Sequence, residues 1–186
     1  MLVQVDWGVI TAGAVPGDLL RFRPETAARI WPDGDGARFA TEIGIPHSGG
    51  LFRILEELVD RDPENPDRAF AEGLDPEPVD TPHGRLQPLG KLFQGDVFVR
   101  LGDGTIWVCD PDSEIEYELI HRDVSSLSYL VYKFAVEKPG PEERPDPYDW
   151  AAVEEIVREG MSRWDPLPFE SGAQFWESFL DSYPML

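Results

Sequence analysis

Residues 89–138 read LGKLFQGDVFVRLGDGTIWVCDPDSEIEYELIHRDVSSLSYLVYKFAVEK and carry the clearest secondary-structure pattern of this chain. Val97, Val99 and Leu101 alternate with Phe98 and Arg100, and β-branched and aromatic side chains dominate 105–109, as is typical of half-buried strands. The tripeptide Gly-Asp-Gly at 102–104 separates the two runs, and its last glycine accepts the positive φ of a primed hairpin turn. We therefore predict an antiparallel hairpin with Asp-Gly as its tight turn.

A third run, 113–120, alternates acidic with apolar side chains. Because strand side chains point to opposite faces in turn, its three glutamates are predicted to share one face, with same-face neighbours about 7 Å apart. At that spacing the carboxylates repel one another and present a ridge of negative charge. With two acids just before the run, this acidic ridge forms our candidate partner-binding site: Asp110, Asp112, Glu114, Glu116 and Glu118.

Other interpretations of the acidic ridge remain open at this point. A solvated strand face would need no partner at all. Metal binding or acid–base catalysis would need convergent carboxylates, one of them with a pKa raised by burial, and alternation along a strand disperses them instead. We expect no metal and no catalytic residues here.

The acidic run is followed by a predicted helix with a polar cap. The segment Asp123-Val124-Ser125-Ser126 offers side chains that can cap the first helical N–H groups. Apolar residues then recur at i, i+3, i+4 and i+7, a spacing that predicts one buried helical face. They are Leu127, Leu130, Val131 and Phe134.

Two more helices are predicted toward the C-terminus. Asp146-Pro147 resembles an N-cap with proline in the first turn, ahead of Trp150, Val153, Ile156 and Val157. A capping box at 171–174 precedes an aromatic stripe that we expect to pack on the core. The stripe contains Phe175, Trp176, Phe179, Leu180 and Tyr183.

The region before residue 89 gives weaker signals. A helix led by proline is predicted over 24–30, and a shorter one over 37–43 ended by Gly44. Residues 51–59 fit a helical stripe or a strand, and five prolines among acids mark a loop over 63–82. We predict one domain over 1–186, with a poorly defined segment 1–34, a core over 35–138, and a linker with C-terminal helices over 139–186.

The charge of the chain favours a basic protein as partner. With 16 basic and 36 acidic residues, the formal net charge is −20. Such a field repels nucleic acid and attracts a cationic protein surface. Cys109 is the single cysteine, which excludes an internal disulfide and suits a reducing, cytoplasmic setting. No apolar run approaches membrane-spanning length, so we expect no membrane partner.

Motifs for cofactors or metals are absent from the sequence. His47, His83 and His121 are far apart, lack partner cysteines, and fit no zinc spacing. We expect them to be surface or capping groups. No cofactor is predicted.

Several short motifs follow one another in a characteristic order along the chain: Ile43-Gly44-Ile45-Pro46, Pro88-Leu89-Gly90, Gly104-Thr105-Ile106-Trp107 and Ser125-Ser126-Leu127. Their order resembles the SUKH superfamily of immunity proteins, most closely its fourth group. The resemblance covers residues 35–138 and implies an α+β fold with a largely antiparallel sheet flanked by helices, and a role in neutralising a cognate toxin, often a nuclease or deaminase. No catalytic residues carry over.

We therefore expect a non-enzymatic protein-binding module whose anionic face covers the cationic groove of a basic toxin. Two alternatives remain. One is an intracellular scaffold or regulatory domain of the same fold that has no toxin partner. The other is an acid–base hydrolase that stacks sugars on a tryptophan such as Trp31 or Trp107, beside a carboxylate pair. The sequence leaves the oligomeric state open.

Overall fold

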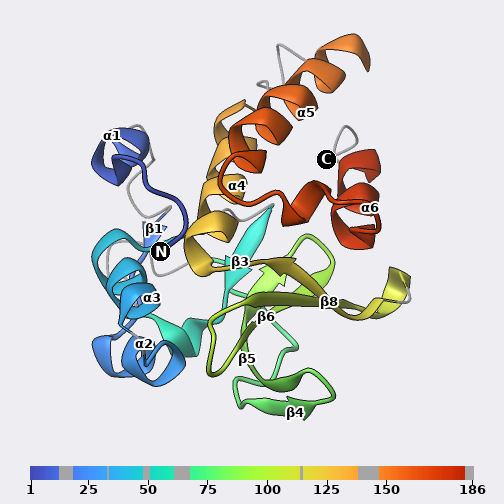
Figure 1. The fold of residues 1–186 in the computed structure, drawn as a ribbon. Coiled ribbons are helices and arrows are strands. Elements are labelled where there is room, and N and C mark those ends of the chain that lie inside the picture. Colours follow the sequence, from blue (N-terminus) through green and yellow to red (C-terminus); the bar gives the residue numbers. More distant parts are fainter. Residues whose placement is uncertain are drawn as a thin grey trace.

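An antiparallel sheet of six strands forms the centre of the computed structural model (Figure 1). The strand order is β3-β5-β6-β7-β8, and β4 pairs with β5 off this path. The structure describes residues 1–12, 19–32, 34–47, 51–60, 68–113, 115–137 and 147–182. The strands are β3 Phe52–Ile54, β4 Val79–Thr81, β5 Gly84–Leu92, β6 Gly95–Arg100, β7 Ile106–Asp110 and β8 Ile115–His121. A separate two-stranded sheet pairs β1 Leu19–Leu20 with β2 Ile45–Pro46.

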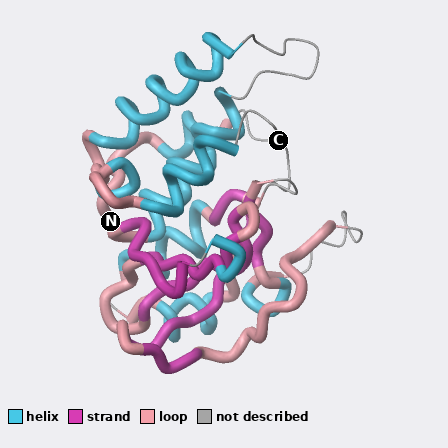
Figure 2. The backbone as a smooth tube through the Cα atoms, turned by 90° about the vertical axis from the view of Figure 1, so that its right-hand side faces the viewer, coloured by secondary structure: helices cyan, strands magenta, loops and turns pink. Residues whose placement is uncertain are grey.

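In Figure 1, α4, α5 and α6 lie together above the six-stranded sheet, while α1, α2 and α3 lie to its left. Figure 2 shows the largest group of helices again above the strands. This arrangement confirms the predicted α+β class. The helices are α1 Trp7–Thr11, α2 Pro24–Ile30, α3 Asp35–Arg38, α4 Val124–Glu137, α5 Pro147–Ser162 and α6 Gln174–Ser182. Shorter helical turns are η1 Phe39–Ile43, η2 Glu56–Leu58, η3 Pro111–Ser113 and η5 Leu167–Phe169.

The main core lies between the sheet and the helices. From the sheet, Val97, Val99, Ile106 and Val108 are fully buried. The predicted stripe of α4 meets them, and the predicted aromatic stripe of α6 adds three more buried rings. The contributors from these two helices are Leu127, Leu130, Val131, Phe134, Phe175, Trp176 and Phe179. Tyr183 lies outside the described residues.

The N-terminal segment also contributes to this core, although its sequence gave only weak signals. Val3 is fully buried and Trp7 is 6% exposed. The Leu2 N–H donates a 2.6 Å hydrogen bond to Asp123 Oδ2. Asp123 Oδ1 accepts from the Ser126 N–H at 2.9 Å, which confirms the predicted cap of α4. One carboxylate therefore holds both the start of α4 and the start of the chain.

The β6–β7 hairpin is confirmed, but its predicted turn is wrong. A primed turn with Asp-Gly at its centre needs a positive φ at the aspartate, and Asp103 is not among the residues with positive φ. The positive values belong to Gly102 and Gly104. The loop is longer, and the Gly104 N–H donates to the Arg100 carbonyl at 3.0 Å.

Two further predictions for helices differ from the structure. α6 begins at Gln174, so Ser171 does not cap it. On α5, Val153 and Val157 are buried as predicted, whereas Ile156 is 47% exposed. The ambiguous stretch 51–59 is a strand followed by a helical turn.

Candidate functional site

The strand that carries the acidic ridge contains a β-bulge, which separates its carboxylates. β7 and β8 pair Val108 with Glu118 and Asp110 with Ile115. Two residues of β8 therefore face one residue of β7, Cys109. Because of this extra residue, Ile115 and Glu118 lie on the same face although they are three positions apart. The alternation that we predicted for this run is broken at the bulge.

Glu118 lies on the helical side of the sheet. Its Oε2 accepts a 3.0 Å hydrogen bond from the Phe175 N–H in the first turn of α6. Burial raises the pKa of Glu118, and its hydrogen bonds from the Phe175 and Gln174 N–H groups oppose that shift. This carboxylate therefore holds the start of α6 in place and is not displayed outward as we expected.

The other members of the acidic ridge differ in exposure. Asp110 is only 5% exposed and accepts a 3.2 Å hydrogen bond from the Asp112 N–H, which fixes η3. Asp112 and Glu116 are exposed. Glu114 lies outside the described residues. The structure thus offers two described carboxylates of the ridge to a partner.

A second apolar cluster covers the sheet face opposite α4, which we name the outer face. Leu86, Phe98 and Trp107 are buried there. Tyr117 is half-buried, and its ring packs edge-on against Phe98 at a centroid distance of 5.8 Å. The partly buried side chains around them are Leu74, Cys109, Tyr117 and Leu119.

Carboxylates surround the half-buried part of the outer face. Burial raises the pKa of the Cys109 thiol, and the charges of Asp96, Asp110 and Glu116 raise it further. The pKa of Tyr117 is raised by burial, then by Cys109, and then by Glu116 and Asp96. Asp96 also pairs with Lys91 at 3.0 Å. This end of the outer face therefore has a negative field.

At the other end of the outer face, Trp107 is held by polar neighbours. The imidazole of His83 packs against it at a centroid distance of 4.7 Å with the rings tilted by 31°, and the Arg100 guanidinium lies 5.3 Å from its ring centroid. Its Nε1 donates to Thr105 Oγ1 at 3.0 Å. Trp107 is only 8% exposed, so it offers no open face for stacking a sugar.

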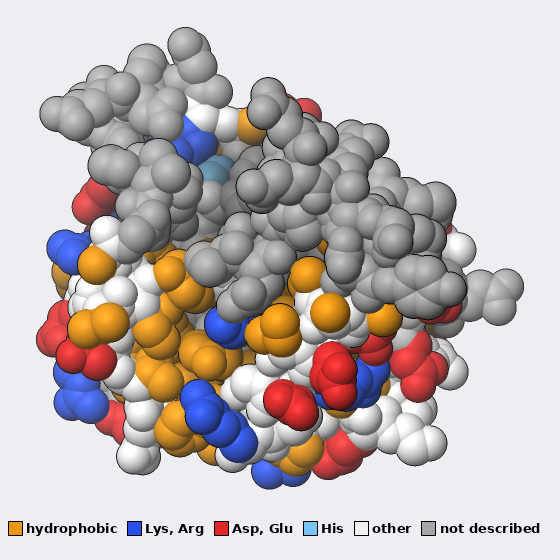
Figure 3. All heavy atoms as spheres, turned by 90° about the horizontal axis from the view of Figure 1, so that it is seen from above, with side chains coloured by type: hydrophobic (Ala, Val, Ile, Leu, Met, Phe, Trp, Pro, Cys, Tyr) orange, Lys and Arg blue, Asp and Glu red, His pale blue; other side chains and the backbone are white. Residues whose placement is uncertain are grey.

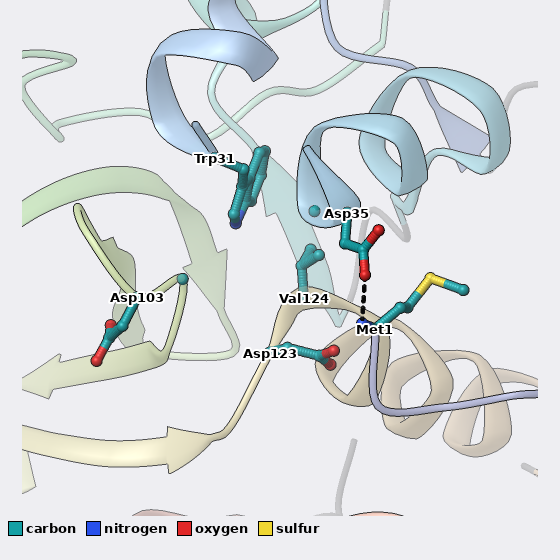
Figure 4. Close-up of a pocket in the computed structure, with 8 residues that line it drawn as sticks. Met1, Trp31, Asp35, Asp103, Asp123 and Val124 are labelled. Carbon is teal, nitrogen blue, oxygen red and sulfur yellow. Dashed lines mark hydrogen bonds and ion pairs between the residues drawn. The ribbon is translucent and has the colours of Figure 1, made fainter. Parts of the chain in front are cut away.

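A cavity of about 50 Å³ lies beside Trp31, between α3, the β6–β7 turn and the start of α4 (Figure 4). Its size is far below the roughly 300–1,000 Å³ of typical small-molecule pockets. Trp31 is 3% exposed, and its Nε1 has no hydrogen-bond partner among the described residues. The cavity is lined by Met1, Trp31, Asp35, Gly36, Asp103, Gly104, Asp123 and Val124.

The carboxylates of this cavity are engaged elsewhere. Asp35 pairs with the N-terminal amine and with Arg38, and hydrogen bonding to that amine, more than charge, lowers its pKa. Asp103 pairs with Arg100, whose hydrogen bonds lower its pKa. A general acid needs the opposite shift. The hydrolase alternative therefore finds no support at the tryptophan–carboxylate pocket of the described structure.

A serine, a histidine and an aspartate meet in the core. Ser126 Oγ donates to Asp165 Oδ2 at 2.9 Å, and His121 Nδ1 lies 3.1 Å from the same hydroxyl oxygen and 3.6 Å from Asp165 Oδ2. All three side chains are fully buried. A hydrolytic triad needs serine and acid on opposite ring nitrogens and an accessible hydroxyl. Here both contact Nδ1, so the cluster ties β8, α4 and the segment before η5 together.

Two of the three histidines differ from our expectation of surface or capping groups, whereas His83 is exposed as expected. His121 is fully buried, and His47 is 4% exposed with a pKa lowered to about 4, chiefly by burial. The His47 Nδ1 accepts a hydrogen bond from the Ile54 N–H at 3.2 Å. Within the described ranges, no three His, Cys, Asp or Glu side chains converge on a metal site. In the same residues, no helix combines the length and apolarity needed to cross a membrane.

A shallow groove of about 340 Å³ runs between α4 and α5. Figure 3 views the molecule from above and shows hydrophobic side chains with basic ones among them on this helical side. The sequence pattern missed this surface because it assigned Ile156 to the core. The groove is lined by Tyr129, Lys133, Ile156, Glu159, Gly160 and Arg163.

The fold and these surfaces define a strongly acidic α+β protein with helices on one face of its sheet. A model of the SUKH-4 immunity protein family matches residues 11–182, and the chain belongs to this family. It is thus a member of the SUKH superfamily, and membership implies immunity against a toxin. The match extends well beyond the range 35–138 that carried the resemblance in sequence. No curated protein and no solved structure matches the chain.

Proposed function

We propose that this protein neutralises its cognate toxin by covering a basic surface of it, and that it acts by binding rather than by catalysis. The observation that carries the proposal is the net charge of −20 on a member of an immunity family. Enzymes that act on nucleic acids bind a polyanion and need a basic groove. A nuclease or deaminase toxin would therefore offer the complement of this charge.

The exposed members of the acidic ridge support contact at that end of the sheet. Asp112 and Glu116 are the described ridge residues that we assign to the interface. Asp110 and Glu118 add charge but are engaged in the fold. Further exposed carboxylates lie just before β4 and within it, and they extend the negative field of the protein. They are Glu72, Asp75, Glu77 and Asp80. Cytoplasmic action fits the single cysteine.

Kinetics of association test the proposal directly. A toxin captured by pull-down from the native host would be mixed with the protein at low and high ionic strength, and survival of cells expressing that toxin would be scored with and without the protein. We expect protection, and an association rate that falls by at least about tenfold from low to high salt. An association rate independent of salt would remove the electrostatic mechanism while leaving immunity intact.

A matched pair of double variants locates the charge effect. Asp112→Asn with Glu116→Gln removes two exposed carboxylates near the outer face. Glu155→Gln with Glu159→Gln removes two exposed carboxylates of α5. Both double variants change the net charge by the same amount. Only the first is expected to slow association markedly, because it removes charges that we assign to the interface. If the protein fails to protect against the toxin and does not bind it, the scaffold alternative replaces the immunity function.

A further inference from the structure

The outer face is only partly covered by the rest of the chain. Figure 1 shows α4, α5 and α6 on the other side of the sheet. Leu86, Phe98 and Trp107 are buried on the outer face, with Leu74 packed on them. Beyond this cover, three side chains of β7 and β8 remain partly exposed: Cys109, Tyr117 and Leu119.

The β-bulge places a carboxylate beside this half-exposed apolar surface. Glu116 occupies the bulge opposite Cys109, and it acts electrostatically on both the Cys109 thiol and the Tyr117 hydroxyl. No ion pair or hydrogen bond joins Glu116 to another described residue. Asp96 faces Cys109 in the register of β6 and β7 and borders the same surface, where Lys91 pairs with it. The carboxylates of Glu116 and Asp96 therefore border the aromatic ring of Tyr117.

An aromatic ring beside a carboxylate with no ion pair is suited to a guanidinium group. Guanidinium is planar, stacks on aromatic rings, and binds carboxylates through two parallel N–H groups, whereas a lysine ammonium lacks the planar shape. We propose that an arginine of the toxin docks on the outer-face patch formed by Cys109, Glu116, Tyr117 and Leu119, with Asp96 at its border. This proposal rests on the proposed function and names the surface and the contacting group.

The charges argue for this occupant over others. A second copy of the chain would carry the same formal net charge of −20 and be repelled, and an acidic segment would face Glu116 directly. Tyrosine and arginine are enriched at the hot spots of protein interfaces, where a ring and a charge are desolvated together. The patch thus supplies one half of such a contact.

A small probe tests the patch without the toxin. N-acetyl-L-arginine amide would be titrated into the isotopically labelled full chain and followed by backbone amide NMR shifts. N-acetyl-L-citrulline amide, its neutral isostere, is the matched control probe. We expect arginine-specific shifts concentrated at Asp96, Cys109, Glu116 and Tyr117. Shifts of equal size at exposed acids throughout the surface would overturn the proposal.

Variants separate the ring from the charge. Glu116→Gln is expected to weaken arginine binding by about threefold, the range of one exposed ion pair, whereas Glu155→Gln on α5 leaves it unchanged. Tyr117→Leu keeps an apolar side chain but removes the ring, and should also reduce the arginine-specific shifts. Equal binding by wild type and Glu116→Gln would overturn the proposal. If the toxin still binds in that case, only this surface is refuted and the immunity function stands.

Discussion

The carboxylate of Glu118 on β8 accepts a hydrogen bond from the backbone N–H of Phe175, 57 residues further along the chain. The edge strand of the sheet therefore caps a helix that the sequence places in a separate C-terminal segment. Two positions earlier on the same strand, Glu116 is exposed and has no such role. The two glutamates provide a matched test of structural against surface function.

Glu118→Ala is expected to lower the free energy of unfolding by about 1 kcal/mol, because the N–H of Phe175 loses its partner. Glu118→Gln should retain most of the stability, since its amide oxygen still accepts the bond and no charge is buried. Glu116→Ala should change stability by less than about 0.5 kcal/mol. Urea unfolding measures all three, and equal losses for both alanine variants would contradict the capping role.

Acid is expected to destabilise the protein through its buried histidines. Burial lowers the pKa of His121 below 6.5 despite its hydrogen bond to Asp165, so the folded state holds this ring neutral. As pH falls below about 6.5, the unfolded chain gains a proton that the folded chain does not, and stability decreases. His47, with a pKa lowered to about 4, acts in the same direction.

Asp165 extends the loss to lower pH. Burial alone would raise its pKa, but hydrogen bonds from His121, the Arg122 N–H and Ser126 outweigh burial and lower it. Its contribution is present above the unfolded pKa near 3.8 and is lost as pH falls through the lower folded value. Urea unfolding from neutral to acidic pH should show stability decreasing from about pH 6.5, with a shallower decrease in His47→Gln. A flat profile above pH 5, roughly, would refute the buried neutral histidines.

Gly90 is predicted to be irreplaceable because it pairs with Ile54 of the neighbouring antiparallel strand β3, whose backbone lies very close to it. A Cβ added there would collide with the Arg53 carbonyl oxygen and approach the Ile54 backbone. Gly90→Ala should therefore cost about 2–3 kcal/mol by forcing the strands apart. Gly160→Ala on α5 meets nothing closer than 3.8 Å and should stabilise the protein by about 0.5–1 kcal/mol. Thermal unfolding of the pair decides between steric and general effects of removing glycine.

Leu130→Asp should unfold the protein under native conditions. Leu130 is fully buried on α4. Placing an unpaired charge there costs free energy both for the cavity and for desolvation, and the combined cost exceeds a typical free energy of unfolding of about 5–15 kcal/mol. The control is Ile156→Asp, at a side chain that is 47% exposed, which should remain folded. Far-ultraviolet circular dichroism distinguishes them, and a folded Leu130→Asp variant would show that α4 is not part of the core.

Local patterns predicted the elements whose side chains keep a regular period. The stripe of α4 and the apolar residues of β6 and β7 lie where their spacing placed them, because a 3.6-residue or two-residue period maps directly onto one buried face. The predicted alternation of side chains along β8 was wrong. Its bulges opposite Cys109 and near Ile106 are set by pairing with β7. No local rule shows where a strand takes an extra residue, so the acidic ridge was predicted too uniform.

Long-range contacts were equally out of reach. Ser126, His121 and Asp165 meet although 39 residues separate Ser126 from Asp165. The N-terminal Leu2 N–H donates to Asp123 across 121 residues. Each of these polar residues looks like a surface group in isolation. Only the packing of α4 against β8 and the N-terminal segment buries them together.

The β-bulge of β8 has a consequence for how this chain meets others of its kind. β8 is an edge strand of the six-stranded sheet, and an exposed edge strand can pair with strands of other molecules, which leads to aggregation. The β-bulge twists this edge strand, and the exposed Glu116 at the bulge adds a negative charge to it. Both features discourage backbone pairing with another strand. The protein can therefore expose the aromatic outer-face patch close to the edge strand of its sheet and still resist aggregation.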